Sequence, residues 1–235
     1  MSGLVVTERV GPIAVITLNR PQRHNSLIPE LVRDLLDALA ELNEPSAVRA
    51  LILQANGRSF STGGDVQGFV DHQADVAAYA GELVGLLNQA ILRLTAFPAP
   101  ILAAVHGVVT GGSLGLVLAC DIILVAPEVT FTPFYTAVGF SPDGGWTAML
   151  PALIGVKRAA NALLFNAPIT AQQAVDWGVA QEIVVREQIH ARARSLAEQL
   201  ARQPTGSVQR ARRLVWGDGA GLAERLEAER RQFIQ

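Results

Sequence analysis

The sequence is short of several features, and each shortage excludes a class of protein. It contains one cysteine, Cys120, so no disulfide can form within the chain. Charged residues make up only 17% of the 235 residues and the net charge is −2, which argues against a nucleic-acid or membrane-surface binder. The apolar run from Leu114 to Ala126 is interrupted by Asp121 and is too short to span a membrane. We therefore expect no nucleic-acid partner and no membrane partner.

The start of the chain and the spacing of its polar residues exclude further classes. The N-terminus lacks a basic segment followed by an apolar one, so no secretory signal is visible and a cytoplasmic protein is expected. No set of His, Cys, Asp and Glu has the spacing of a zinc or calcium site. Neither a dinucleotide-binding fingerprint nor a P-loop occurs. We predict no metal site and no separate cofactor.

Hydrophobic residues make up half of the chain, enough for a large core. Apolar segments of strand length alternate with segments of helical periodicity, which predicts an α/β fold. Strands are predicted at 4–10, 13–18, 48–53, 101–105, 122–125, 130–135 and 182–185. Helices are predicted from 29, at 75–97, at 114–120, from the 141–145 turn to about 154, at 157–165, 171–177 and 187–202, and from 207 onward.

The C-terminal part is predicted to be almost entirely helical and rich in Arg and Glu. These residues, Arg212 and Glu229 among them, are interspersed, which indicates a solvated helix face. A helical tail after an α/β core is either a lid or an oligomerisation element.

Two glycine-rich segments are the most informative feature of the chain. They are Ser61-Thr62-Gly63-Gly64-Asp65 and Gly111-Gly112-Ser113-Leu114-Gly115, and each comes where a predicted strand gives way to a helix. Glycine there lets backbone N–H groups approach a ligand, because no Cβ is in the way. Two such groups converging on one point would stabilise a carbonyl oxygen that gains negative charge, as in thioester chemistry. The alternative is that the glycines serve only the turns, with Asp65 as a helix N-cap.

Two further interpretations concern single residues. Gly111–Gly115 fits the G-x-S-x-G nucleophile elbow of a serine hydrolase, with Ser113 as the nucleophile and His190 as its base. His190, however, falls in a strongly helical, charged stretch rather than in a loop near the sheet. Asp143 lies in a turn of small residues before an apolar helix. It is either a helix cap or a general base whose pKa is raised by burial.

Four segments, taken in order, resemble the enoyl-CoA hydratase/isomerase (crotonase) superfamily. They are Ile16–Pro21 with Asn25–Leu27; Phe60–Asp65; Ala104–Gly107 through Gly111–Gly112 to Ala119–Ile123; and Val138–Gly139 through Pro142–Gly145, followed by Ala174–Val179. The resemblance runs from Leu4 to Gln235 and covers nearly the whole chain. Within the superfamily the chain is most similar to enoyl-CoA isomerases and 1,2-epoxyphenylacetyl-CoA isomerases.

This resemblance implies a fold, a ligand and an assembly. The implied fold is an α/β spiral of ββα units over residues 1–180, which binds acyl-CoA. A C-terminal helical region, residues 181–235, would serve oligomerisation and is shorter than usual for the family. The implied partners are an acyl-CoA thioester, with coenzyme A as part of the substrate, and further copies of the chain in a homotrimer or a dimer of trimers.

The resemblance also implies the residues of the site. The backbone N–H groups of Gly64 and Gly112 would hold the thioester oxygen as an oxyanion hole. Residues that would contact CoA are Arg20, Arg23, Thr62 and Asp65. Residues that would line the acyl pocket are Phe69, Tyr135 and Trp146.

The sequence departs from the hydratase pattern at two positions. The two glutamates that position water in hydratases would fall at Gly115 and Tyr135, and neither residue can act as a carboxylate. Asp143 falls where isomerases of the superfamily carry their catalytic carboxylate. We therefore predict an enzyme that shifts a double bond in an enoyl-CoA through a thioester enolate, with Asp143 as the proton shuttle. The alternatives are an enoyl-CoA hydratase of the same superfamily and a catalytically silent acyl-CoA binder.

Overall fold

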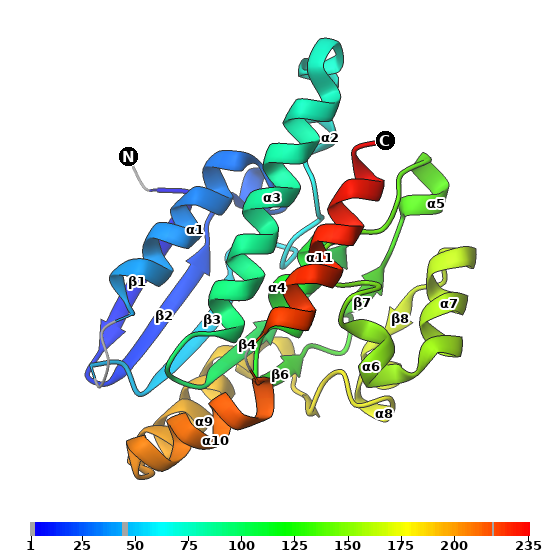
Figure 1. The fold of residues 1–235 in the computed structure, drawn as a ribbon. Helices are drawn as coiled ribbons and strands as arrows, with labels where there is room; N and C mark the ends of the chain where they lie inside the picture. Colours follow the sequence, from blue (N-terminus) through cyan, green and yellow to red (C-terminus); the bar gives the residue numbers. More distant parts are fainter. Residues whose placement is uncertain (1–2, 44–46, 218) are drawn as a thin grey trace.

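The computed structural model describes residues 3–43, 47–217 and 219–235, which form two β-sheets surrounded by helices (Figure 1). The strands are β1 (Val5–Val10), β2 (Ile13–Leu18), β3 (Ala50–Ala55), β4 (Ile101–Val105), β5 (Val108–Thr110), β6 (Ile122–Val125), β7 (Thr130–Thr132), β8 (Ile169–Thr170) and β9 (Glu182–Ile183). The α-helices are α1 (Pro29–Glu41), α2 (Val66–Asp71), α3 (Val76–Thr95), α4 (Leu114–Leu118), α5 (Tyr135–Val138), α6 (Leu150–Ile154), α7 (Val156–Phe165), α8 (Ala171–Asp176), α9 (Ile189–Arg202), α10 (Thr205–Trp216) and α11 (Ala220–Phe233). Short 3-10 helices are η1 (Pro21–Arg23), η2 (Gln73–Asp75), η3 (Gly111–Ser113) and η4 (Arg186–Gln188).

The main sheet has the strand order β1-β2-β3-β4-β6-β9. β1 pairs antiparallel with β2, and all the other neighbours pair in parallel. β2 and β4 are buried along their whole length, and a strand covered on both faces needs no polar alternation, which explains their apolar sequences. β1 is a mostly exposed edge, where the charges of Glu8 and Arg9 oppose pairing with another chain.

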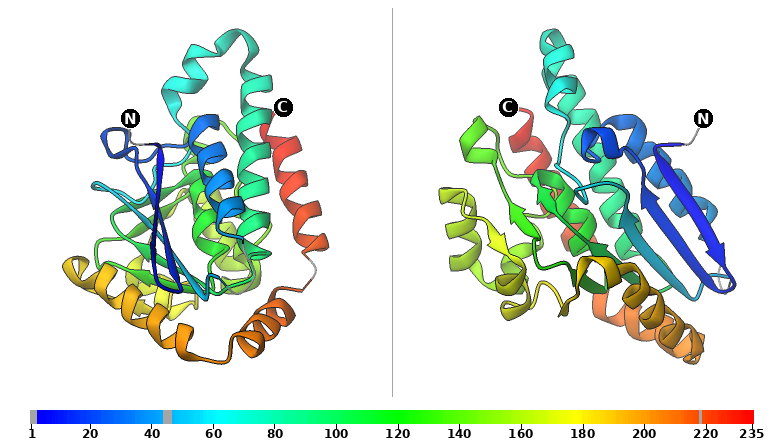
Figure 2. Two further views of the ribbon diagram at one scale, coloured as in Figure 1. Left: turned by 90° about the vertical axis from the view of Figure 1, so that its left-hand side faces the viewer. Right: turned by 180° about the vertical axis from the view of Figure 1, so that it is seen from behind.

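Helices cover both faces of the main sheet. α1 and α3 pack against each other in front of the strands, and α11 lies along α3 (Figure 1). α9 packs against β2, β3, β4 and β6 and lies on the opposite face, as the view from behind shows (Figure 2). α1 is held by one apolar stripe that includes Leu31, Leu35 and Leu39, as a helix with one buried face requires.

A second sheet, of β5, β7 and β8, lies beside the main sheet (Figure 1). β5 is parallel to β7, and β8 is antiparallel to β7. Ser61 bridges to Val109 of β5, so the first glycine segment lies against the strand that leads into the second one.

The predicted α/β class is confirmed, and two element predictions need correction. The strand predicted at 130–135 ends at Thr132, because Pro133 has no N–H to donate and Phe134 has a φ of +64°; Tyr135 instead begins α5. The helix predicted directly after the 141–145 turn begins only at Leu150. The tail from 207 is helical as predicted and consists of two helices, α10 and α11, of which α10 begins at Thr205. Among the strands and α-helices, β5, β8 and α5 were not predicted, and α2 was expected only as the helix that Asp65 would cap.

The C-terminal region is helical as predicted, from η4 to the end of α11. β9 follows the predicted boundary at residue 180 and still belongs to the main sheet. The division at residue 180 and the use of the helices for oligomerisation stay predictions. Within the described ranges, no helix combines the length and the apolar character needed to cross a membrane. The same residues contain no group of three or more His, Cys, Asp and Glu side chains placed to hold a metal.

Candidate active site

The two glycine segments lie side by side. The amide of Ser61 donates to the carbonyl of Val108 (3.3 Å), and the amide of Thr110 donates back to the carbonyl of Ser61 (3.1 Å). A Cβ built on Gly63 would lie 2.7 Å from the carbonyl oxygen of Thr110, which is too close for any other residue. The segments therefore approach each other backbone to backbone, and glycine makes that approach possible.

Gly64 and Gly112 both line one cavity of about 710 Å³. The loop and cap hydrogen bonds of the described residues include none donated by the amide of Gly64 or of Gly112. Gly112 lies in the first turn of η3, where the N–H groups have no partner inside the helix. Neither amide therefore has an acceptor among these bonds, and their donation to a bound thioester oxygen stays a prediction.

The walls of this cavity are largely apolar. Its polar side chains are Thr62, Gln73, Thr110, Tyr135 and Asp143. Three phenylalanine rings from distant parts of the chain meet at one wall: the Phe140 ring is 5.1 Å from that of Phe233 and 5.6 Å from that of Phe69. The remaining lining residues are Leu27, Gly63, Val66, Val70, Leu83, Val84, Leu87, Val108, Gly111, Pro133, Phe134 and Val138, with Gly64 and Gly112. A cavity of this size and character fits an apolar organic group.

Among the residues that the structure describes, Asp143 is the single carboxylate that lines the cavity. Its side chain is only 5% exposed, and the hydroxyl of Tyr135 donates to Oδ1 (2.5 Å) and to the Asp143 carbonyl (3.1 Å). A Cβ built on Gly112 would lie 2.9 Å from Oδ2 and 3.0 Å from Oδ1. The carboxylate therefore faces the Gly112 turn across a space that only glycine leaves open.

The surroundings of Asp143 raise its pKa from 3.8 to about 7. Burial is the main cause, because it disfavours the charged form; the hydrogen bond from Tyr135 opposes it, and the negative charge of Glu229 adds to it. Burial and the nearby Asp143 charge also raise the pKa of Tyr135 well above 10. A carboxylate with a pKa near 7 can both take and return a proton at neutral pH.

The loop that carries Asp143 packs directly on the second glycine segment. A Cβ on Gly144 (φ +58°) would lie 2.3 Å from both Cα and O of Gly112. A Cβ on Gly115 would lie 2.5 Å from the Gly144 carbonyl oxygen and 2.4 Å from Cδ1 of Ile91. Position 115 thus has no room for the glutamate that hydratases carry there, and position 135 holds the tyrosine bonded to Asp143.

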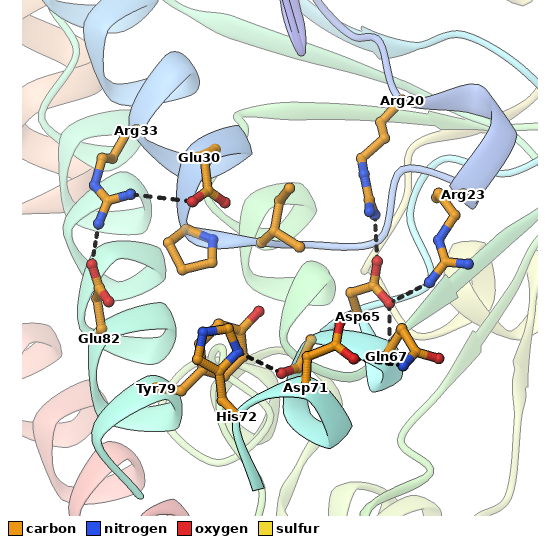
Figure 3. A pocket seen from close by; sticks show the side chains of 13 residues that line it. Arg20, Arg23, Glu30, Arg33, Asp65, Gln67, Asp71, His72, Tyr79 and Glu82 are labelled. Carbon is orange, nitrogen blue, oxygen red and sulfur yellow. Dashed lines mark hydrogen bonds and ion pairs between the residues drawn. The ribbon is translucent and has the colours of Figure 1, made fainter. Parts of the chain in front are cut away.

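Three of the residues predicted to contact CoA form one cluster beside a smaller pocket of about 350 Å³ (Figure 3). The Asp65 carboxylate lies between Arg20 (2.6 Å) and Arg23 (2.9 Å) and also accepts from Ser26 and from the amide of Gln67. Burial alone would raise the pKa of Asp65, but the two arginines outweigh it and lower the pKa to about 2. Asp65 is the N-cap of α2, so the capping interpretation is confirmed.

The predicted CoA contacts therefore divide between two places. Thr62 lines the large cavity, and Arg20, Arg23 and Asp65 line the smaller pocket. Arg23 is half exposed, whereas Arg20 is mostly buried by its contacts with Asp65 and Ser26. The roles of these residues toward CoA stay predictions.

Two sequence interpretations need correction at the site. Trp146 does not line the cavity: it is fully buried and its indole N–H donates to the carbonyl of Gly111 (2.8 Å), so it supports the second glycine turn without facing the cavity.

The serine-hydrolase interpretation is wrong. Ser113 is fully buried and donates to the carbonyls of Thr110 and Ser61, while His190, on α9, contacts the side chain of Gln54 on β3. Phe69 and Tyr135 do line the cavity, as predicted.

Sequence reasoning missed two residues of the last helix. Glu229 is 5% exposed and bonds the loop that follows Asp143, and Phe233 lines the cavity. Arg212 is also buried, bonded to Asp121 and to the carbonyls of Leu94, Thr95 and Phe97. The solvated-face interpretation is therefore wrong for Arg212 and Glu229. Their charge pattern along the helix gives no signal, because burial here depends on elements far away in the sequence.

Comparisons with known proteins agree with this architecture. The model of the family described as Enoyl-CoA hydratase/isomerase matches residues 8–233. The chain is 33% identical over 197 residues to 1,2-epoxyphenylacetyl-CoA isomerase of Escherichia coli (strain K12), a match that covers 82% of this chain and 74% of that protein. It is 31% identical over 202 residues to 4-chlorobenzoyl coenzyme A dehalogenase-2 of Arthrobacter sp, covering 86% and 73%.

A solved structure shows the same fold. The crystal structure of enoyl-CoA hydratase from Bacillus halodurans superimposes with a TM-score of 0.91 at 26% identity, over 99% of this chain and 94% of that one. The family match, the sequence relatives and this superposition confirm the predicted crotonase-type fold. The chain belongs to the enoyl-CoA hydratase/isomerase (crotonase) family.

Proposed function

We propose that this protein is an acyl-CoA enzyme that moves a carbon–carbon double bond in an enoyl-CoA. One observation carries the proposal: a buried carboxylate with a pKa of about 7, Asp143, faces the Gly112 turn inside an apolar cavity. The names of the similar proteins support the substrate class, since the isomerase, the dehalogenase and the hydratase are each named for a CoA compound.

In the proposed reaction, Asp143 removes a proton from the carbon next to the thioester carbonyl of a 3-enoyl-CoA. The C–H electrons move into the conjugated system, and negative charge collects on the thioester oxygen. The amides of Gly64 and Gly112 donate to that oxygen, and each such donor contributes roughly 3 kcal/mol of transition-state stabilisation. Asp143 then returns the proton two carbons further along the chain, which leaves the 2-enoyl product. The atoms balance without water or any other reactant.

The cavity favours this reaction over water addition. Hydration needs acids that position a water molecule, and the two positions expected for them hold Gly115 and Tyr135. Gly115 is packed against the backbone of Gly144, and Tyr135 donates to Asp143. Of the described residues that line the cavity, Asp143 is then the one carboxylate within reach of substrate, and a proton shuttle needs only one.

The predicted binding residues complete the proposal. Phe69 and Tyr135 contact the acyl group, and Thr62, which lines the same cavity, contacts the CoA moiety. Arg20 and Arg23, held by Asp65, offer guanidinium N–H groups to the CoA phosphates beside the smaller pocket, whose lining also contains other carboxylates (Figure 3).

Assembly into a homotrimer or a dimer of trimers is part of the same proposal. Exposed apolar side chains on α7 and α10, namely Val156, Leu164, Phe165, Leu214 and Val215, supply surface for contacts between copies. Sedimentation velocity at micromolar concentration tests this, and a monomer throughout would contradict it.

The reaction itself is tested by comparing wild type with Asp143→Asn on a panel of 3-enoyl-CoAs. Formation of the conjugated product, followed by absorbance, is expected to fall at least a hundredfold. Asp176→Asn, an exposed carboxylate on α8, is the matched control and should keep full activity. Equal activity of Asp143→Asn and wild type would overturn the proposal.

Two further readouts separate the alternatives. A hydratase would incorporate oxygen-18 from labelled water into its product, and the proposed isomerase would not. A silent binder would bind the thioesters without exchanging deuterium at the carbon next to the carbonyl.

A further inference from the structure

The carboxylate of Glu229, on α11, is bonded to the loop that follows Asp143. Oε1 accepts from the amide of Thr147 (2.7 Å), the hydroxyl of Thr147 (2.6 Å) and the amide of Ala148 (2.8 Å). Oε2 accepts from the amide of Gly145 (2.9 Å). The last helix of the chain thus binds a segment more than eighty residues earlier in the sequence.

Glu229 is a buried carboxylate that forms no ion pair with any residue that the structure describes. It is only 5% exposed. A buried carboxylate is tolerated when donors replace the water it loses, and here backbone amides do so. Residues 144–149 form turns rather than a helix, so these amides lack helical partners and Glu229 supplies the acceptor.

The loop is held from two sides. On one side Gly144 touches the backbone of Gly112, and on the other Glu229 binds the amides while Arg225 donates to the carbonyl of Ala148 (2.9 Å). The helix itself is fixed to α3, because Leu226 is fully buried and its carbonyl accepts from the side chain of Asn88 (3.0 Å). α11 lies along α3 in two views of the molecule (Figures 1 and 2).

We propose that Glu229 is a positioning residue of the active site, whose carboxylate holds the 143–148 loop so that Asp143 faces the Gly112 turn. The inference rests on the proposed function, because it assigns Glu229 to the proton shuttle of that reaction. Glu229 touches neither the cavity nor the reacting atoms. It acts through the backbone of the loop and through its charge.

The negative charge of Glu229 has a measurable effect that its packing alone would not have, because it acts on the pKa of Asp143. The titratable groups that act on Asp143 are Tyr135 from α5, whose hydrogen bond lowers its pKa, and Glu229 from α11, whose charge raises it. Removing the Glu229 charge must therefore lower the pKa of Asp143. Since the base works in its ionised form, the rise of rate with pH then moves to lower pH.

Three variants test this. Glu229→Gln keeps the shape and can still accept from Thr147 and Ala148, but it loses the charge and the bond from Gly145. Glu229→Ala loses all four bonds. Glu224→Gln removes a charge from the exposed side of the same helix and serves as the matched control.

We expect Glu229→Gln to shift the acid limb of kcat/KM down by roughly half a unit to one unit, with KM within twofold of wild type. Glu229→Ala should lose kcat by at least tenfold with little change in KM, because misplacing the base slows chemistry more than binding. Glu224→Gln should match wild type in both. An unmoved acid limb in Glu229→Gln, or an unchanged kcat in Glu229→Ala, would overturn the inference.

A measurement without substrate separates this inference from the proposed function. Carbon-13 NMR of carboxyl-labelled aspartate, with the Asp143 signal assigned by its loss in Asp143→Asn, gives the titration midpoint of Asp143 in the free protein. The midpoint should fall in Glu229→Gln even if the reaction proves to be another one. If folded Glu229→Gln and wild type have the same Asp143 titration midpoint, the proposed role of Glu229 is wrong. If only the proposed reaction is wrong, the midpoint will still be lower in Glu229→Gln than in wild type.

Discussion

Two buried aspartates, Asp65 and Asp143, have opposite pKa shifts, and their partners explain the difference. Burial raises the pKa of both. Asp65 is paired with Arg20 and Arg23, which bring its pKa down to about 2. Asp143 has one neutral donor, Tyr135, and a negative neighbour, Glu229, so its pKa stays near 7. Asp65 is therefore a fixed structural charge, and Asp143 can change its protonation state during a reaction.

Tyr135→Phe is predicted to raise the pKa of Asp143 further, because it removes the hydrogen bond that opposes burial. The acid limb of kcat/KM should move to higher pH, so that activity at pH 6 falls more than activity at pH 9. Steady-state rates measured across that range check the shift. Tyr79→Phe, which removes the other tyrosine hydroxyl, outside the large cavity, should leave the limb in place. A limb that does not move in Tyr135→Phe would contradict the prediction.

At the scale of elements, α11 contributes residues to the candidate site although its charged sequence indicates only a solvated helix. Glu229 lies on its inner side and binds the 143–148 loop, and Phe233 at its end lines the cavity. Its polar residues on the outer side, such as Glu224 and Arg231, are exposed as predicted. One helix therefore has a solvated face and a face that completes the site, and only its contact with α3 decides which is which.

Phe233→Ala is predicted to change which acyl groups the enzyme prefers. The ring packs on Phe140 and Phe69, and its removal enlarges the apolar wall of the cavity. The preference in kcat/KM should move by at least about tenfold toward longer or bulkier acyl groups, the lower end of what one methylene group contributes in an apolar pocket.

A competition assay with acyl-CoAs of increasing chain length measures this shift. Gln232→Ala, the exposed neighbour on the same helix, should keep the wild-type order. The same chain-length profile in Phe233→Ala and wild type would exclude Phe233 from the acyl pocket.

At the scale of the whole molecule, burial of Asp143 lowers the free energy of unfolding at neutral pH. In the unfolded chain Asp143 titrates near 3.8, and in the folded protein near 7, so between these pH values the folded state holds the extra proton. The free energy of unfolding therefore falls as pH rises from about 4 to 7 through this group. Asp65 acts the other way, since its folded pKa of about 2 lies below its ordinary value and its contribution is lost only as pH falls below 4.

Asp143→Asn is accordingly predicted to be more stable than wild type at pH 8, by up to a few kcal/mol. The difference should shrink as pH falls and vanish near pH 4, where wild-type Asp143 is protonated in both states. Urea unfolding at pH 4, 6 and 8 measures it, with Asp176→Asn as the control expected to show no such trend. A constant difference at all three pH values would show that burial of the charge is not the cause.

Local patterns determined the alternation of strands and helices, the two glycine segments, and the absence of an acid at positions 115 and 135. The apolar periodicity of α1 and the unbroken apolar run of β4 can be recognised from the sequence, because each pattern is formed by residues close together in the chain. The four family-like segments likewise lie in the sequence itself, and the family match bears them out.

Only the tertiary structure decided what surrounds Asp143. The raised pKa depends on burial by distant elements and on the charge of Glu229, more than eighty residues away in the chain. The same is true of Trp146, which supports Gly111 instead of lining the cavity, and of Phe233, which reaches the site from the C-terminal end. A motif can name a carboxylate, but desolvation and charge proximity act through space, so the chemistry of that carboxylate follows from the packed fold.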